Sequence, residues 1–335
     1  MLRYRYIILA FILLAPCWGG CASANETVRG LRGINLNEAL DTERFWLVRP
    51  TEEDVVRIKT AGFNAVRLPL RVLPHIDSSG ELANRYIGRI KESVDLILSK
   101  GLRVVIDVHD SEFSSMGPET SGQLLERVWD QLSLALSGYD ERVMVEILNE
   151  PRSALMPAVW DSIQRRIVKS LLAQDSRRIV VLQGSEWSTV DSLAGLKPQL
   201  DENPARLVGT AHFYSPMQFT HQGAPWVRNS QLWRGRKWTG SLWERFDVDR
   251  QLRPLTMLPK GTGVYIGEFG VHRNAEASSA NRWVRYLSQR MSDLDVGWFY
   301  WSYAGEFGIF DRAKKCWMPL ILELLPDFHG PLCSQ

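Results

Sequence analysis

The sequence predicts an α/β protein built as one (β/α)8 barrel, also called a TIM barrel, with no second domain. Eight short apolar segments recur along the chain, helical patterns lie between them, and polar residues stand at the ends of six of the segments. The length of 335 residues is compatible with a barrel, which takes roughly 250 residues or more.

The eight apolar segments have the character of β-strands that are covered on both faces. They are rich in Val, Ile and Leu, and many are continuously apolar rather than alternating. The expected strands are residues 31–36, 65–70, 104–109, 143–148, 179–183, 207–213, 264–269 and 296–301.

Helical patterns fill the intervals between these strands. Within residues 85–99, apolar side chains recur at helical spacing from Ile87 to Leu98, and Gly101 follows as a C-terminal stop. Residues 124–136, 157–172 and 277–291 show a similar pattern. A regular alternation of strand and helix indicates a parallel barrel.

The longest irregular stretch, residues 214–241, follows the sixth expected strand and carries Trp226, Trp233 and Trp238. Loops of this length are usually functional or disordered. We expect an ordered loop, because three tryptophans argue against disorder. The 13 tryptophans of the chain also suit a protein that stacks flat ligands such as sugar rings.

Residues 1–24 have the features of an export signal. Arg3 and Arg5 precede an apolar run over residues 7–15, and the sequence from Ala22 to Ala24 offers a cleavage site of small residues. The alternative is a buried first helix, but the run is too short to span a bilayer. We expect a signal peptide over residues 1–24, a folded domain over residues 25–335 without a transmembrane span, and a periplasmic or secreted protein.

Cys21 offers a second interpretation of the leader. Gly19 and Gly20 supply the small residues of a bacterial lipobox, although Trp18 stands where an aliphatic residue is expected. In this interpretation Cys21 carries a lipid anchor, and the protein is an outer-membrane lipoprotein.

Cys316 and Cys333 are the only cysteines beyond the leader. We expect a disulfide between them because an exported protein folds in an oxidising compartment. The alternative is two buried free thiols.

Charge and motifs set several functions aside. Loss of Arg3 and Arg5 leaves equal numbers of basic and acidic residues in the mature chain, which gives no electrostatic reason to expect a nucleic-acid partner. No phosphate-binding Gly-Lys-Ser/Thr loop is present. The six histidines lack metal-ligand spacing, so we expect neither a cofactor nor a metal.

Two glutamates follow expected strands at positions that stability alone does not explain. Glu150 comes after the fourth strand, directly before a proline, and Glu268 lies in the seventh strand, shortly before Gly270. The carboxyl ends of strands in a parallel barrel face the active site. A pair of carboxylates across such a mouth is the machinery of glycoside hydrolysis. The other polar or aromatic strand ends are Arg67, His109, Asn149, His212 with Tyr214, and Trp301.

This ordered set resembles glycoside hydrolase family 5, the cellulase family of retaining β-glycosidases. The constellation of that family is an Arg, a His, an Asn-Glu pair, a His-x-Tyr, a Glu and a Trp, in that chain order. The resemblance covers essentially the whole mature chain. Residues 212–226 are also similar to the sixth-strand loop of bacterial endoglucanase-like members. The residues that match are Arg67, His109, Asn149 with Glu150, His212 with Tyr214, Glu268 and Trp301.

The resemblance implies a role for each carboxylate and its neighbours. Glu268 is expected to be the nucleophile, kept anionic by Arg67 and oriented by Tyr214. Glu150 is expected to be the general acid and then the base that activates water. His212, on the same strand face as Tyr214, is expected to tune the proton of Glu150.

The remaining residues are expected to bind substrate. Asn149 should reach the sugar 2-hydroxyl, and His109 should bind a sugar hydroxyl or brace Arg67, the alternative being a core histidine. Trp301 is the expected floor for the sugar at the cleavage point. Trp187 and Trp226 are either extensions of that platform or core aromatics. Asp107 is interpreted as an inward structural residue, and Glu306 as a solvated loop charge.

The expected function is a retaining, endo-acting β-1,4-glucanase that acts as a monomer on a polysaccharide or oligosaccharide. One alternative is a related specificity, for β-mannan or a bacterial exopolysaccharide glucan. Another is a catalytically silent carbohydrate-binding protein, although such a descendant usually lacks one carboxylate and both are present here. A lipid-anchored structural protein of the envelope would leave the polar strand ends unexplained.

Overall fold

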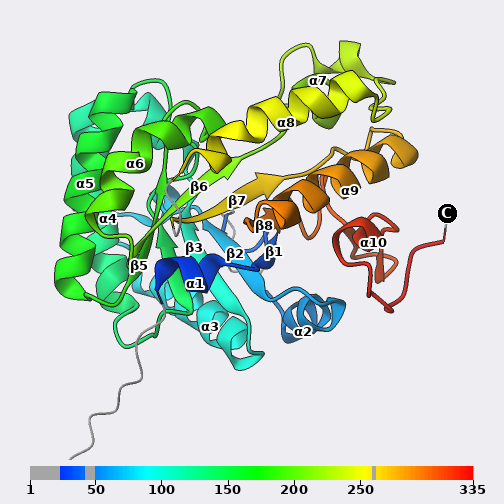
Figure 1. Ribbon diagram of the computed structural model, residues 1–335. Helices are drawn as coiled ribbons and strands as arrows, with labels where there is room; N and C mark the ends of the chain where they lie inside the picture. Colours follow the sequence, from blue (N-terminus) through cyan, green and yellow to red (C-terminus); the bar gives the residue numbers. More distant parts are fainter. Residues whose placement is uncertain (1–22, 42–49, 259–261, 335) are drawn as a thin grey trace, which may run out of the picture.

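Eight parallel strands close into a barrel that helices surround (Figure 1). The structure is a computed structural model and describes residues 23–41, 50–258 and 262–334. The strands neighbour one another in chain order, and β1 pairs with both β2 and β8 to close the ring. The expected single-domain (β/α)8 barrel is confirmed. The strands are β1 (Arg32–Asn35), β2 (Ala65–Leu70), β3 (Arg103–Val108), β4 (Val143–Glu146), β5 (Ile179–Gln183), β6 (Leu207–His212), β7 (Gly263–Phe269) and β8 (Gly297–Tyr300).

All eight expected strands are present, and their ends differ from expectation by at most two residues. The difference that matters most is in β4, which ends at Glu146 rather than at residue 148. The backbone of Glu150 has a φ of 46°, in the left-handed region that an extended strand does not enter. Asn149 and Glu150 therefore lie on the loop after β4.

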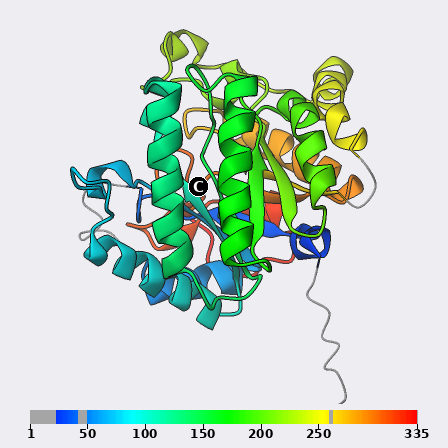
Figure 2. The same ribbon diagram turned by 90° about the vertical axis from the view of Figure 1, so that its left-hand side faces the viewer.

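The four helices that the sequence predicts are also present, and each is somewhat longer than its apolar pattern. They are α3 (Asn84–Ser99), α4 (Pro118–Ala135), α5 (Pro157–Gln174) and α9 (Ala277–Asp293). Gly101 follows α3 with a φ of 70°, which is the left-handed conformation expected of a residue after a helix end. Helices α4 and α5 lie side by side on the outside of the barrel (Figure 2).

Within the described residues, three further helices belong to the outer layer: α2 (Glu52–Ala61), α6 (Leu193–Glu202) and α8 (Leu242–Thr256). Two of them contain a proline, Pro198 in α6 and Pro254 in α8. Proline normally ends a helix, and this hides both helices in the sequence. The long loop before α8 is ordered and contains the short helix α7 (Met217–Thr220).

The barrel is closed at its amino-terminal end by the short helix α1 (Ala24–Val28). The side chain of Ser23 caps this helix, and the backbone N–H of Ala24 donates to the carbonyl of Ala205 over 2.9 Å. Gly297 makes room for the helix, because a Cβ there would lie 2.5 Å from the carbonyl oxygen of Val28. The floor leaves the opposite end of the barrel as the mouth.

The expected leader lies almost entirely outside the described residues, which begin at Ser23, and so does Cys21. Ser23 and Ala24, the last two residues of that leader, belong to the floor of the barrel. Among the described residues, none of the helices combines the length and apolar character needed to cross a bilayer.

A disulfide joins Cys316 and Cys333 near the C-terminus. Cys316 lies in the small antiparallel sheet of β9 (Phe310–Asp311) and β10 (Cys316–Trp317), and the N–H of Cys333 donates to the carbonyl of Trp317 over 2.8 Å. The short helix α10 (Ile321–Leu324) lies inside the loop that the disulfide closes. The bond thereby attaches the last residues of the chain to the barrel.

We predict that the double substitution Cys316→Ser and Cys333→Ser lowers the free energy of unfolding by about 3 kcal/mol, the loop-entropy value for a loop of this size. Urea unfolding measures the loss, and reduced wild-type protein should match the double variant. Turnover below the melting temperature should not change. An unaltered free energy of unfolding would show that the bond contributes nothing.

Candidate active site

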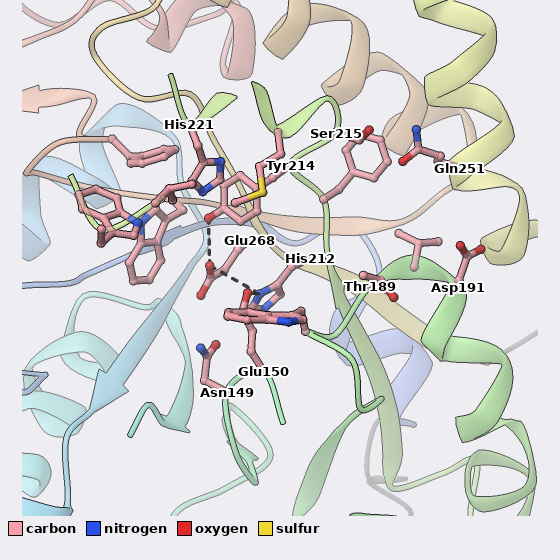
Figure 3. Close-up of a pocket in the computed structure, with 18 of the residues that line it drawn as sticks. Asn149, Glu150, Thr189, Asp191, His212, Tyr214, Ser215, His221, Gln251 and Glu268 are labelled. Atoms are coloured by element: carbon pink, nitrogen blue, oxygen red, sulfur yellow. Dashed lines mark hydrogen bonds and ion pairs between the residues drawn. The ribbon is translucent and has the colours of Figure 1, made fainter. Parts of the chain in front are cut away.

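The mouth of the barrel holds a cavity of about 870 Å³ (Figure 3). Its lining contains nine of the ten residues expected at the site. The tenth, Arg67, is fully buried beneath the cavity floor. The nine are His109, Asn149, Glu150, Trp187, His212, Tyr214, Trp226, Glu268 and Trp301.

Arg67 on β2 is surrounded by three carboxylates. It donates from Nε and Nη2 to Glu146 over 3.0 and 2.6 Å, and from Nη1 to Oε1 of Glu268 over 2.7 Å. Nη2 also lies 2.9 Å from Asp107. Burial alone would lower the pKa of Arg67, but these three negative charges outweigh it and raise the pKa well above the ordinary value. The guanidinium is therefore a permanent cation under the cavity.

Two amide side chains complete the hydrogen bonding of Arg67. Nη1 donates to Oδ1 of Asn35 over 2.9 Å, and Nη2 donates to Oδ1 of Asn149 over 2.8 Å. The second bond turns the amide of Asn149 so that its oxygen faces the guanidinium and its NH2 group remains for the cavity. Arg67 thus positions both the Glu268 carboxylate and the Asn149 amide.

Glu268 is held at both carboxylate oxygens. Arg67 occupies Oε1, and the phenol of Tyr214 donates to Oε2 over 2.9 Å. Burial, followed by the charge of Glu268, raises the pKa of Tyr214 well above its ordinary value. The phenol consequently stays protonated and remains a donor.

Glu150 stands opposite on the loop after β4. Its backbone N–H donates to Oε1 of Gln183 over 2.8 Å, which anchors the loop to β5. Its Oε1 lies 2.8 Å from Nδ1 of His212, and the same nitrogen lies 3.6 Å from Oε2 of Glu268. His212 therefore stands between the two glutamates, as the labelled side chains show (Figure 3).

Glu150 and His212 share one proton in the hydrogen bond between them. Burial would raise the pKa of Glu150, but the hydrogen bond and charge of His212 lower it overall. Burial would lower the pKa of His212, but the charges of Glu268 and Glu150 raise it overall. Both directions favour the proton on the imidazole, which lies 2.8 Å from the carboxylate oxygen.

His109 connects the charged floor to the aromatic wall. Its Nδ1 lies 2.6 Å from Asp107, and its ring stacks on Trp301 with centroids 5.4 Å apart and planes 8° apart. Burial would lower its pKa, but the charge and hydrogen bond of Asp107 raise it to about 9. His109 therefore meets Arg67 through the carboxylate that they share, and Asp107 is the inward structural residue that the sequence predicts.

Trp187 and Trp226 are not core aromatics, because they are 54% and 59% exposed and both line the cavity. The ring of Trp226 rests against His272 and Phe307 at centroid distances of 5.8 and 6.1 Å. The other tryptophans of the long loop differ: Trp238 is buried in the core, and Trp233 is half-buried.

The sequence analysis missed two structural members of the site. Glu146 is fully buried in β4, where it binds Arg67 and accepts from the phenol of Tyr265 over 2.9 Å. Gln183 at the end of β5 donates to Glu146 and accepts from the backbone of Glu150. A carboxylate and an amide inside strands that are covered on both faces were the available signal, since such groups need buried partners.

Three residues outside the expected set have simpler positions. His221, to which the sequence assigned nothing, lines the cavity and packs its ring on Tyr214 at 4.8 Å. Glu306 is exposed and pairs with His272 over 3.2 Å, as a loop charge would.

Glu150, His212 and Glu268 could together coordinate a cation, since one donor atom from each lies within 4.8 Å of the others.

The sequence and the fold of this chain are similar to those of known proteins. The family model described as cellulase (glycosyl hydrolase family 5) matches residues 21–306. Endoglucanase H of Acetivibrio thermocellus is 26% identical over 297 residues, which cover 86% of this chain and 31% of that protein. The chain spans between about a third and about half of the length of the first curated relatives that it matches.

Solved structures align over nearly the whole described fold. A hyperthermophilic endo-β-1,4-glucanase in complex with substrate has 29% identity and a TM-score of 0.83, covering 91% of this chain and 100% of that one. Endoglucanase Cel5A of Thermotoga maritima has 31% identity and a TM-score of 0.80, covering 90% and 98%. That enzyme has also been solved with cellobiose and with mannotriose. This chain therefore belongs to the cellulase family, glycosyl hydrolase family 5.

Proposed function

We propose that the protein is a retaining β-glycosidase that cleaves β-linked polysaccharide by double displacement, as an endo-β-1,4-glucanase. The observation that carries the proposal is the spacing of the two carboxylates. One oxygen of Glu150 and one of Glu268 lie within 4.8 Å of each other. Retaining glycosidases hold their carboxyl groups about 5–5.5 Å apart, whereas inverting enzymes need about 6.5–9.5 Å to admit a water molecule.

In the first step Glu268 attacks the anomeric carbon and forms a glycosyl ester. Arg67 and Tyr214 hold its two oxygens, so the nucleophile is oriented before substrate arrives. Glu150 receives the shared proton from His212 and gives it to the departing oxygen. The amide of Asn149 faces the 2-hydroxyl of the sugar, where a hydrogen bond strengthens in the transition state.

The second step reverses the role of Glu150. Ester formation removes the negative charge of Glu268, whose attraction is the foremost cause that raises the pKa of His212. The pKa of the imidazole falls once that charge is gone. Glu150, now deprotonated, takes a proton from water as the water oxygen attacks the anomeric carbon, and the bond from that carbon to Glu268 breaks to release the carboxylate.

The exposed tryptophans favour action on a polymer. Trp301 is the floor for the sugar at the cleavage point, and Trp187 and Trp226 provide indole surfaces further along the cavity. Sugar rings have an apolar face that stacks on such surfaces. A cavity with several platforms suits a chain of sugars, and thus endo action.

The second candidate is hydrolysis of β-mannan. It is favoured by one observation, that Cel5A of Thermotoga maritima has been solved with mannotriose as well as cellobiose. An exopolysaccharide glucan is the other substrate class that the same chemistry would accept. A silent binding protein is disfavoured, because both carboxylates are present and held in place by hydrogen bonds.

We also propose that the protein is exported, as the N-terminal sequence predicts. Because Ser23 caps α1 and Ala24 packs into the barrel floor, processing before Ser23 would leave the floor complete. Lipid attachment at Cys21 would meet this requirement, since Cys21 would then be the first residue of the mature chain.

We predict that Glu268→Gln lowers turnover by roughly a thousandfold or more, because an amide cannot form the glycosyl ester. The fold should persist: Arg67 keeps two carboxylate partners and the shape is unchanged. Reducing-sugar release from a panel of β-1,4-glucan, β-mannan and xyloglucan measures the activity, and a thermal melt serves as the control. Equal release by the variant and the wild type on any of these polymers would rule out the nucleophile assignment.

We predict that Glu150→Ala lowers turnover of polysaccharide by about a hundredfold to ten-thousandfold, the usual contribution of a general acid. Formation of the glycosyl ester from a dinitrophenyl glycoside should be nearly unaffected, because that leaving group needs no proton. Pre-steady-state release of dinitrophenol isolates this step. If the burst slows as much as polymer hydrolysis does, Glu150 is not the acid.

A further inference from the structure

Two loops at the mouth, after β4 and after β5, are bound to each other beside the acid Glu150. Gln183 accepts from the backbone of Glu150 and from the hydroxyl of Ser188, and the N–H of Trp187 points to the carbonyl of Pro151 over 3.4 Å. These bonds hold the backbone of Trp187 against the loop that carries Glu150, and both residues line the cavity.

The loop after β5 adopts a conformation that is costly for ordinary residues. Glu186, Trp187 and Ser188 have φ values of 65°, 64° and 50°, three successive left-handed residues of which none is glycine. Each such residue costs on the order of 1–2 kcal/mol. A conformation of this kind persists only when the surroundings determine it, and here it presents the indole to the cavity.

Arg152 is the side chain that joins the indole to the acid loop. Its guanidinium carbon lies 3.9 Å from the ring centroid of Trp187, and its Nη1 donates to the carbonyl oxygen of Glu150 over 2.8 Å. Its own backbone N–H donates to Oγ of Ser114 over 3.2 Å. One face of the indole is therefore covered by a cation, while Trp187 as a whole remains 54% exposed toward the cavity.

We propose that Arg152 is a positioning residue for the leaving-group side of the cleft, which fixes the plane of Trp187 and the backbone of Glu150 at the same time. The inference rests on the proposed function, since Glu150 marks the side where the departing sugar lies. A sugar that stacks on the open face of Trp187 would meet a surface already held in place. Its glycosidic oxygen would then lie within hydrogen-bond reach of the Glu150 carboxyl, so binding energy from that sugar would assist bond cleavage.

The test compares substrates with and without a sugar on the leaving-group side. For Arg152→Gln we expect kcat/KM on cellopentaose to fall by roughly fivefold to tenfold, the fold-change that corresponds to a partly desolvated cation–π contact. On dinitrophenyl cellobioside, which has no sugar there, the change should be under about twofold. Arg152→Lys keeps a cation and a donor and should recover most of the loss.

Two further variants separate positioning from general stability. Arg273 is the matched control, because it also donates one Nη to a backbone carbonyl of a mouth loop, that of Gly305, over 2.8 Å. Arg273→Gln should leave kcat/KM unchanged on both substrates. In a Trp187→Ala background, Arg152→Gln should cost far less on cellopentaose than it does alone, because the two residues act together.

An equal loss on both substrates, an equal loss in Arg273→Gln, or additive losses with Trp187→Ala would overturn the proposal. So would an unchanged kcat/KM on cellopentaose in Arg152→Gln. Failure of the proposed function would look different, because the wild-type protein would then leave both glucosides intact.

Discussion

The structure depends on one buried cation. Arg67 lies under the mouth of the barrel, where it binds Asp107 on β3, Glu146 on β4 and Glu268 on β7. Without Arg67, three carboxylates would lie close together in a dry interior with no guanidinium between them. Loss of the cation would leave the carboxylates buried and uncompensated, a change that costs roughly 3–5 kcal/mol for a buried ion pair, so this cluster couples the fold to the proposed chemistry. Glu268, the proposed nucleophile, is a member of the charge network that joins the strand ends.

The same network assigns different tasks to two glutamates of identical chemistry. Glu268 touches Arg67 directly, whereas Glu150 touches His212. In the proposed mechanism the first arrangement orients the nucleophile, and the second supplies a proton to the acid across a short hydrogen bond. Because the charge of Glu268 raises the pKa of His212, the proposed glycosyl ester at Glu268 would lower the proton affinity of the imidazole beside Glu150. The two half-reactions are thus linked by electrostatics over a few ångströms.

The barrel and the residues at its mouth could be predicted because they depend on short-range patterns. Continuous apolar strands, helical spacing and polar strand ends each leave a mark in the sequence, and nine of the ten expected residues line one cavity. Glu146 is visible in the sequence as a carboxylate within an apolar strand, but its partner could not be named, since Arg67 lies 79 residues away on another strand. The left-handed turn at residues 186–188 also has no local signal, because none of its residues is the glycine that such a turn favours. Helices α6 and α8 were not predicted because each contains a proline. A proline normally predicts the end of a helix, but both helices continue past it in the packed structure.

The claim that joins these parts is that Glu268 attacks carbon while Glu150 works from the opposite side of the departing bond. Two successive displacements restore the starting configuration. Proton NMR of the product in the first moments of β-glucan hydrolysis reads that configuration before mutarotation. The account predicts that the β-anomer appears first and the α-anomer grows later. An α-anomer that appears first would mean a single displacement by water, and would contradict the role of Glu268 as nucleophile.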